Sequence, residues 1–187
     1  MFASQLPPAD PSVTSRDDKT AGGVPIRIYT PDGAEKHPIG VFFHAGGFYA
    51  GSLDSEDYMC RQLAQHVPCV IVSVAYRLTP EHKAPAQIED CLEAFKWTHA
   101  NAADLNGDAD RVFAIGGSAG GCMSTSVTGE LVKNQDTRHM VRGMVAMCPH
   151  ALHDDYIPSD IEHTSRIENH DAAITDTEGV RVAIGMC

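Results

Sequence analysis

The 187-residue sequence has no long apolar run, and its first residues lack the basic and apolar regions of a secretory signal. A membrane-spanning helix needs roughly 18 or more mostly apolar residues in a row, and a signal peptide needs a basic start before an apolar stretch. We therefore expect neither a membrane span nor a secretory leader. The asparagine sequon for N-glycosylation is missing as well, which agrees with a cytoplasmic protein.

Basic residues are scarce: 14 lysines and arginines face 25 aspartates and glutamates, and the formal charge at pH 7 is −11. Nucleic acids and anionic membranes repel a chain of that charge. The hydrophobic content of 43% and the charged content of 21% are ordinary for a globular protein. The composition indicates one globular domain with neither nucleic acid nor a membrane as its partner.

No two cysteines are spaced as C-x-x-C, the pattern of many metal sites and redox pairs. Several of the six cysteines fall within apolar segments, where a thiol behaves as a small buried apolar group. We expect free thiols in a reducing compartment rather than disulfides. The cysteines occupy positions 60, 69, 91, 122, 148 and 187.

Apolar runs and turn signals alternate along the chain. They predict strands at 25–29, 40–44, 69–76, 112–115 and 141–147, and helices at 54–67, 85–103 and 122–133. Strands that alternate with helices favour an α/β fold with a mostly parallel sheet and helices on both faces. Residues 1–24 are polar, contain several prolines and lack periodicity, so we expect a poorly structured arm there and a domain over 25–187.

The most informative motif is the glycine-rich turn over residues 116–121, which follows the apolar run 112–115. A strand, a tight turn with a central serine and a following helix form a nucleophile elbow. Gly116 and Gly120 suit this turn because bulk two residues from the serine would clash. The helix N-terminus points N–H groups and its positive dipole end at Ser118, which makes Ser118 a candidate nucleophile.

Two phosphate-binding motifs use similarly spaced glycines. A P-loop requires lysine after its last glycine, but Cys122 follows Gly121. The dinucleotide motif G-x-G-x-x-G fails too, because Ser118 or Ala119 stands where its second glycine is needed. An ordinary glycine-rich turn between a strand and a helix remains the alternative to a nucleophile elbow.

A second glycine-rich segment, His44-Ala-Gly-Gly47, leaves the apolar run 40–44. In acyl transfer the tetrahedral intermediate carries an oxyanion that needs preorganised N–H donors. Gly46 and Gly47 suit that task because backbone without a side chain can approach a substrate closely. A plain turn is the alternative for this segment alone. Its pairing with a serine elbow downstream favours one site built from two halves.

Three segments together resemble a known family. Residues 44–48 (HAGGF), 76–86 (YRLTPEHKAPA) and 116–121 (GGSAGG) are similar, in order and approximate spacing, to HGGG, YRLAPE and GDSAGG of the hormone-sensitive-lipase branch of α/β-hydrolases. Within that branch, the run 40–56 looks most like fungal polyketide-pathway esterases of the versiconal hemiacetal acetate type, which implies a place in secondary metabolism. The resemblance covers residues 25–150 and implies an α/β-hydrolase fold that lacks its last strands and helices.

The resemblance also implies roles for particular residues. Ser118 matches the nucleophile, and the backbone N–H groups of Gly46, Gly47 and Ala119 match the oxyanion hole. The implied activity is hydrolysis of short acyl esters or lactones through an acyl-enzyme. Neither a metal nor an organic cofactor is implied.

Five further positions match or depart from the family motifs. Arg77 and Glu81 match residues that brace the loop behind the site, and we expect them to be structural. Ala45 replaces the first glycine of HGGG and adds a Cβ near the acyl site. Gly117 replaces the usual aspartate of GDSAGG, and Ala75 stands where many members have aspartate.

The resemblance places the family's catalytic acid and base motifs beyond residue 187, so we expect either a chain that lacks general-base catalysis or a non-catalytic relative that binds a small ligand or partner. Local substitutes are conceivable, although each is more typical of a solvated surface, and a metal site among them lacks a defined ligand pair. These substitutes are Asp154, Asp155, His150, His153, His163 and His170. An unpaired sheet edge would favour self-association.

Overall fold

The computed structural model describes residues 7–33 and 36–149, together with 158, 164, 168, 182 and 185. Its six described strands form one sheet in the order β1-β2-β4-β3-β5-β6. The strands are β1 Val13–Lys19, β2 Pro25–Pro31, β3 His37–Phe43, β4 Val70–Val74, β5 Gly107–Gly117 and β6 Gly143–Met147. All five strands expected from the sequence are present, with ends shifted by a few residues.

Strands β3, β4, β5 and β6 run parallel, and β1 and β2 join them antiparallel. The central position of β3 follows from its apolar run, because a strand between two others must bury both faces. Val41, Phe42 and Phe43 are fully buried there. The expected α/β fold with a mostly parallel sheet is confirmed.

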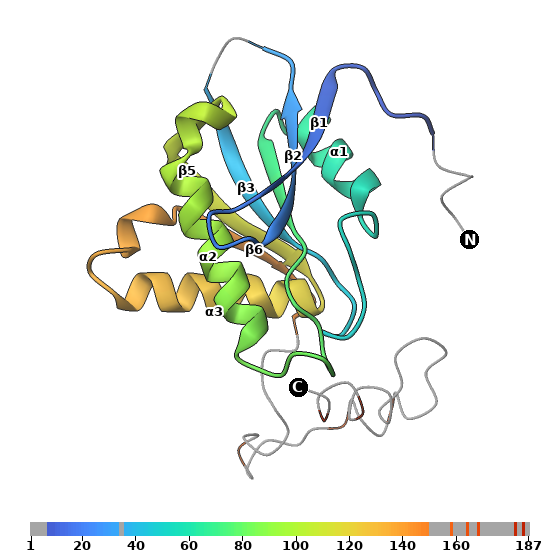
Figure 1. The fold of residues 1–187 in the computed structure, drawn as a ribbon, viewed down its shortest axis with the longest axis vertical. Coiled ribbons are helices and arrows are strands. Elements are labelled where there is room, and N and C mark those ends of the chain that lie inside the picture. Colours follow the sequence, from blue (N-terminus) through green and yellow to red (C-terminus); the bar gives the residue numbers. More distant parts are fainter. Residues whose placement is uncertain are drawn as a thin grey trace.

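Helices cover both faces of this sheet, as Figure 1 shows, with α1 on one side and α2 and α3 on the other. Their bounds are α1 Asp57–His66, α2 Ala86–Ala100 and α3 Ala119–Lys133, with short 3-10 turns at Ala102–Leu105 and Arg138–Met140. Cys60 and Ala64 of α1 pack against Phe42 and Ile71, whereas α2 and α3 bury Phe95 and Val127 against the opposite face. Both helix layers follow from the alternation of strands and helices.

The expected N-terminal arm is wrong for residues 13–19, which form β1 and pair antiparallel with β2. Periodicity does not reveal this strand because only Val13 is buried and the other six residues are exposed. Its stability comes from β2 instead. Asp17 lies opposite Arg27 in the register and receives two hydrogen bonds from the guanidinium, at 2.5 and 3.0 Å.

The two edges of the described sheet differ in character. The β1 edge carries several charged side chains, a common protection against pairing with another chain. Strand β6 carries none, and Met144, Val145 and Met147 are 47%, 45% and 39% exposed. Self-association through such an edge stays a prediction.

The described cysteines differ in burial. Cys60, Cys69 and Cys91 are buried, Cys122 is half-buried and Cys148 is exposed. Burial raises the pKa of the Cys69 thiol to about 11, so this buried thiol is not reactive at neutral pH. None of the helices in the described part of the chain has the length and apolar character needed to cross a bilayer.

Candidate active site

Ser118 lies at the sharp turn between β5 and α3, and its side chain is exposed. Its backbone has φ 51° and ψ −119°, a conformation that L residues rarely adopt and that costs of order 1–3 kcal/mol. Two main-chain bonds hold the turn: Ser118 N–H donates to the Met147 carbonyl at 2.9 Å, and Cys122 N–H donates to the Ser118 carbonyl at 3.0 Å. The strained, exposed serine has the geometry expected of a nucleophile elbow.

Glycines flank this serine because the chain is crowded on both sides. A Cβ on Gly116 would lie 2.5 Å from the carbonyl oxygens of Gly120 and Phe43. A Cβ on Gly120 would overlap the Phe43 carbonyl and lie 2.8 Å from the His44 carbonyl oxygen. The first turn of α3 therefore packs directly on the backbone at the end of β3.

Residues 44–51, which we call the 44–51 loop, follow the carboxyl end of β3, beside the carboxyl end of β5. Phe43 pairs with Gly116 in the parallel register of β3 and β5, so this loop and the elbow leave neighbouring strands side by side. Gly46 has φ 125° and Gly47 has φ 60°, values that glycine adopts without strain. The two segments predicted to form the site thus follow the carboxyl ends of the adjacent strands β3 and β5.

A buried histidine anchors the start of the loop. His44 is 1% exposed and stacks on Tyr76, with ring centroids 4.1 Å apart and an interplanar angle of 12°. The Tyr76 hydroxyl donates to the His44 carbonyl at 2.7 Å. His44 Nδ1 is 2.8 Å from the Ala45 carbonyl oxygen, so this nitrogen carries the proton. Burial lowers the pKa of His44, although the Ala45 carbonyl and the nearby Glu56 oppose that shift.

Three N–H groups of the loop and the elbow have no hydrogen-bond acceptor among the described residues. Gly46 accepts from Tyr49 N–H at 3.2 Å and Ala50 N–H at 2.9 Å, so its carbonyl is engaged. Within the described residues, no hydrogen bond uses the N–H groups of Gly46, Gly47 or Ala119. Ala119 opens α3, where the helix dipole adds a partial positive charge. Such donors are suited to an anion.

The bracing role expected of Arg77 is visible in its contacts. Its guanidinium makes hydrogen bonds of 2.8–3.0 Å with Asp90 of α2, and its Nη2 lies 3.3 Å from Glu89. These partners raise the pKa of Arg77, the hydrogen bond with Asp90 most of all. Glu81, by contrast, is exposed, and no hydrogen bond or ion pair joins its side chain to the described residues.

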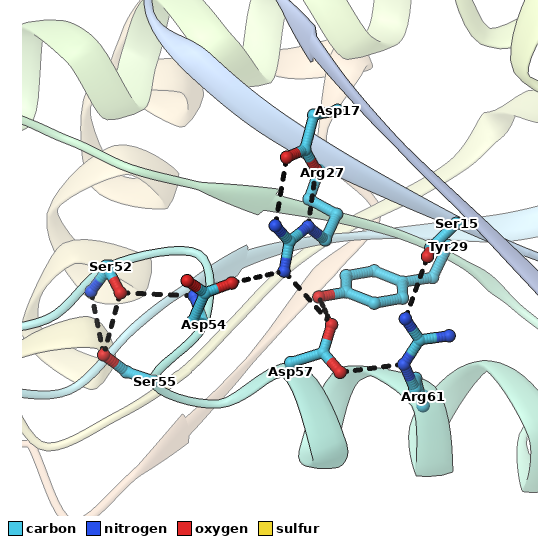
Figure 2. A network of polar contacts seen from close by, with 9 residues as sticks. All are labelled: Ser15, Asp17, Arg27, Tyr29, Ser52, Asp54, Ser55, Asp57 and Arg61. Carbon is cyan, nitrogen blue, oxygen red and sulfur yellow. Dashed lines mark hydrogen bonds and ion pairs between the residues drawn. The ribbon is translucent and has the colours of Figure 1, made fainter. Parts of the chain in front are cut away.

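Sequence reasoning missed a charged cluster that joins β2 to the start of α1. Nη1 of Arg27 on β2 donates to Asp54 Oδ1 at 2.7 Å and to Asp57 Oδ1 at 3.3 Å, contacts drawn as dashed lines in Figure 2. Asp57 also accepts from the Tyr29 hydroxyl at 2.7 Å and from Arg61 Nε at 2.8 Å. We call these residues with Asp17 the Arg27 cluster. The acidic residues at 54–57 indicated only the start of a helix, because their sequence pattern does not predict an ion pair with β2.

The charged groups of this cluster satisfy one another. Burial would raise the pKa of Asp57, but hydrogen bonds from Arg61, Tyr29 and Arg27 outweigh it and lower the pKa. A cavity of about 970 Å³ adjoins the cluster and is lined by residues of β1, β2 and α1. Neither Ser118 nor the glycines of the 44–51 loop line it. We assign it no part in the candidate site.

Six sequence candidates lie outside the described residues. They are Asp154, Asp155, His150, His153, His163 and His170. Within the part of the chain that is described, no three histidine, cysteine or acidic side chains gather to hold a metal ion.

A mostly parallel sheet in this strand order, with a serine elbow after β5, defines an α/β-hydrolase. The chain belongs to that family, because the model of the alpha/beta hydrolase fold matches residues 40–187. The resemblance read from the three motifs is confirmed.

Two curated relatives carry the name versiconal hemiacetal acetate esterase. The protein from Dothistroma septosporum is 35% identical over 162 residues, 84% of this chain and 49% of its own length. That from Emericella nidulans is 37% identical over 185 residues, 97% of this chain and 62% of its own length. This chain thus spans about half to three fifths of these relatives.

Solved structures agree on the fold. The crystal structure of DphMB1 is 34% identical, with a TM-score of 0.83 over 97% of this chain and 58% of its own. A hyperthermophilic esterase from the archaeon Pyrobaculum calidifontis is 30% identical, with a TM-score of 0.79 over 91% of this chain and 53% of its own. The arrangement of the six strands is therefore shared with esterases.

Proposed function

We propose that this protein hydrolyses carboxylic esters with short acyl groups, through an acyl-enzyme on Ser118. The observation that carries the proposal is that an exposed serine in a strained turn and a glycine loop with unused N–H groups follow the adjacent parallel strands β5 and β3. A tetrahedral intermediate needs a nucleophile and oxyanion donors in that proximity. The names of the curated relatives support the same reaction class.

In the proposed reaction, Ser118 Oγ attacks the ester carbonyl carbon and the carbonyl oxygen becomes an oxyanion. The N–H groups of Gly46, Gly47 and Ala119 donate to that oxygen. The alcohol leaves with a proton, and water then releases the acid from the acyl-enzyme. No step requires a metal or an organic cofactor.

The base that takes the Ser118 proton is not assigned to a described residue. His44 is buried beneath the loop and its Nδ1 proton is committed to the Ala45 carbonyl, so we give it a structural role. A serine hydrolase without its base retains a residual rate from the oxyanion hole and binding, about 10³–10⁴-fold over water in serine proteases. Acylation by an activated ester is therefore the reaction to measure.

The esters in question carry a small acyl group. Both curated relatives named above are acetate esterases by name, and Ala45 places a Cβ beside the donors where the family motif has glycine. A methyl group there narrows the space for the acyl chain. We therefore expect acetyl esters to react faster than esters of longer acids.

The test is a stopped-flow burst of the full chain with p-nitrophenyl acetate. We expect stoichiometric p-nitrophenolate release and an acetyl group on the peptide that contains Ser118, both absent in Ser118→Ala. Wild-type protein that gains no acetyl group would refute the esterase proposal. Retained binding of the ester without acylation would then favour a non-catalytic binding protein.

A further inference from the structure

Glu56 reaches from the residue before α1 back to the loop that follows β3. Its Oε2 accepts a hydrogen bond from the N–H of Ala45 at 2.8 Å, and its side chain is half-buried. Ala45 directly precedes Gly46, the first of the three glycines in the 44–51 loop. The contact thus acts on the peptide group next to the proposed oxyanion donors.

The same short stretch of backbone is fixed from its other side. The Ala45 carbonyl accepts from His44 Nδ1 at 2.8 Å, and the backbone of Gly51 passes so close that a Cβ there would lie 2.9 Å from that oxygen. With both the N–H and the C=O of Ala45 held, its ψ angle has little freedom. That angle sets the direction in which the Gly46 N–H points.

The Arg27 cluster anchors the chain segment that carries Glu56. Arg27 binds Asp54 and Asp57, which flank Glu56 in the chain. Figure 2 shows both aspartates turned toward the arginine, and the Ser52 N–H donates to Ser55 Oγ across the turn that contains Asp54. Glu56 therefore projects from a segment that is tied to β2 rather than from a free loop.

We propose that Glu56 is a positioning residue that aims the N–H groups of Gly46 and Gly47 at the oxyanion. Its effect on rate rests on the proposed esterase function, whereas its effect on the loop does not. Oxyanion donors lower a barrier because they are oriented before the reaction, and loss of one donor costs about 10²–10³-fold in rate. Removing Glu56 misaligns donors without deleting them, so the loss is smaller.

The kinetic experiment compares Glu56→Ala, Glu56→Gln and wild type in the burst with p-nitrophenyl acetate. For Glu56→Ala we expect an acylation rate constant at saturation about tenfold lower, with little change in the half-saturating ester concentration. Glutamine keeps an acceptor oxygen, so Glu56→Gln is expected within about threefold of wild type. Glu130→Ala is the matched control, because Glu130 is exposed on α3 and forms its ion pair with Lys133 of the same helix. Equal rates for wild type and Glu56→Ala, or equal losses in both Glu56 variants, would overturn the proposal.

A second experiment does not depend on activity. In the wild-type chain we expect the Ala45 amide proton to exchange slowly with solvent, because its N–H donates to Glu56. Glu56→Ala should speed that exchange at least about tenfold, the equivalent of losing one hydrogen bond, and shift the Gly46 and Gly47 amides. A wild-type Ala45 amide that is unprotected overturns the proposal, whereas a protected amide without acylation refutes only the esterase function.

Discussion

The elbow and the 44–51 loop follow the carboxyl ends of neighbouring strands, yet different contacts hold each of them in place. Main-chain contacts hold the elbow: Ser118 N–H bonds to Met147, and Gly120 leaves room for the end of β3. Side chains from distant segments hold the loop, through Tyr76 and Glu56. The elbow thus depends on glycine, which has no side chain to obstruct close packing, whereas the 44–51 loop depends on hydrogen bonds to side chains.

The largest expected effect comes from filling the space at Gly120. A Cβ there overlaps the Phe43 carbonyl, so Gly120→Ala must push α3 away from β3 and should cost about 3 kcal/mol of unfolding free energy. Gly129→Ala makes the same change in the same helix with nothing within 4 Å, and should stabilise by about 0.5–1 kcal/mol. Urea denaturation followed by circular dichroism measures both. Effects of the same sign would contradict a crowded elbow.

A smaller loss is expected when the loop loses one side-chain bond. Tyr76→Phe removes the hydroxyl that donates to the His44 carbonyl at 2.7 Å and leaves that buried carbonyl with one donor fewer. We expect a loss of about 1–2 kcal/mol of unfolding free energy and slower acylation of Ser118. Tyr58→Phe, at an exposed tyrosine, should change neither measurement. An unchanged Tyr76→Phe would mean that the loop does not depend on this side chain.

Relief of strain at the elbow should give a gain of similar or smaller size. Ser118→Gly allows the φ of 51° without cost and should stabilise by about 1 kcal/mol, while it abolishes acylation. Ser126→Gly, at an ordinary helical position of α3, should destabilise by about 0.5 kcal/mol. Both are measured by thermal and urea denaturation. Destabilisation by Ser118→Gly would show that the turn is not strained.

The smallest expected effect is a pH dependence of the unfolding free energy that comes from His44 of the 44–51 loop. The elbow has no histidine and should contribute none. Burial lowers the pKa of His44 below its ordinary value of 6.5, so unfolded chains bind a proton at that site more readily than folded ones. Its contribution to stability is then present above pH 6.5 and is lost as the pH falls through the folded-state pKa. His44→Asn should flatten the plot of urea midpoint against pH between 7 and the acid range. An identical slope in both proteins would exclude this role.

Much of the fold was predictable because local patterns repeat along the chain. The apolar runs at 40–44, 69–76 and 112–115 each identified a buried strand, and the glycines around Ser118 identified the turn. Helix α3 begins at Ala119, three residues before the expected start. Apolar periodicity cannot mark a first turn that consists of small residues packed on β3.

Strand β1 and the Arg27 cluster were not predictable in the same way. A strand with only Val13 buried shows no alternation, and it exists because β2 offers a partner with a matching register. The ion pairs of Arg27 join residues that are 10 to 30 positions apart. Sequence spacing does not predict such pairs, because the chain has 25 acidic residues that could pair with an arginine.

By itself, the sequence determined the α/β class, the central strands and the turn that exposes Ser118, because apolar spacing and glycine act over a few neighbouring residues. Tertiary structure decided which supports reach the 44–51 loop. The hydrogen bond from Ala45 to Glu56 and that from Tyr76 to His44 form only when β3, β4 and α1 bring distant segments together. Directional bonds of this kind depend on ångström-scale placement, which no local pattern specifies.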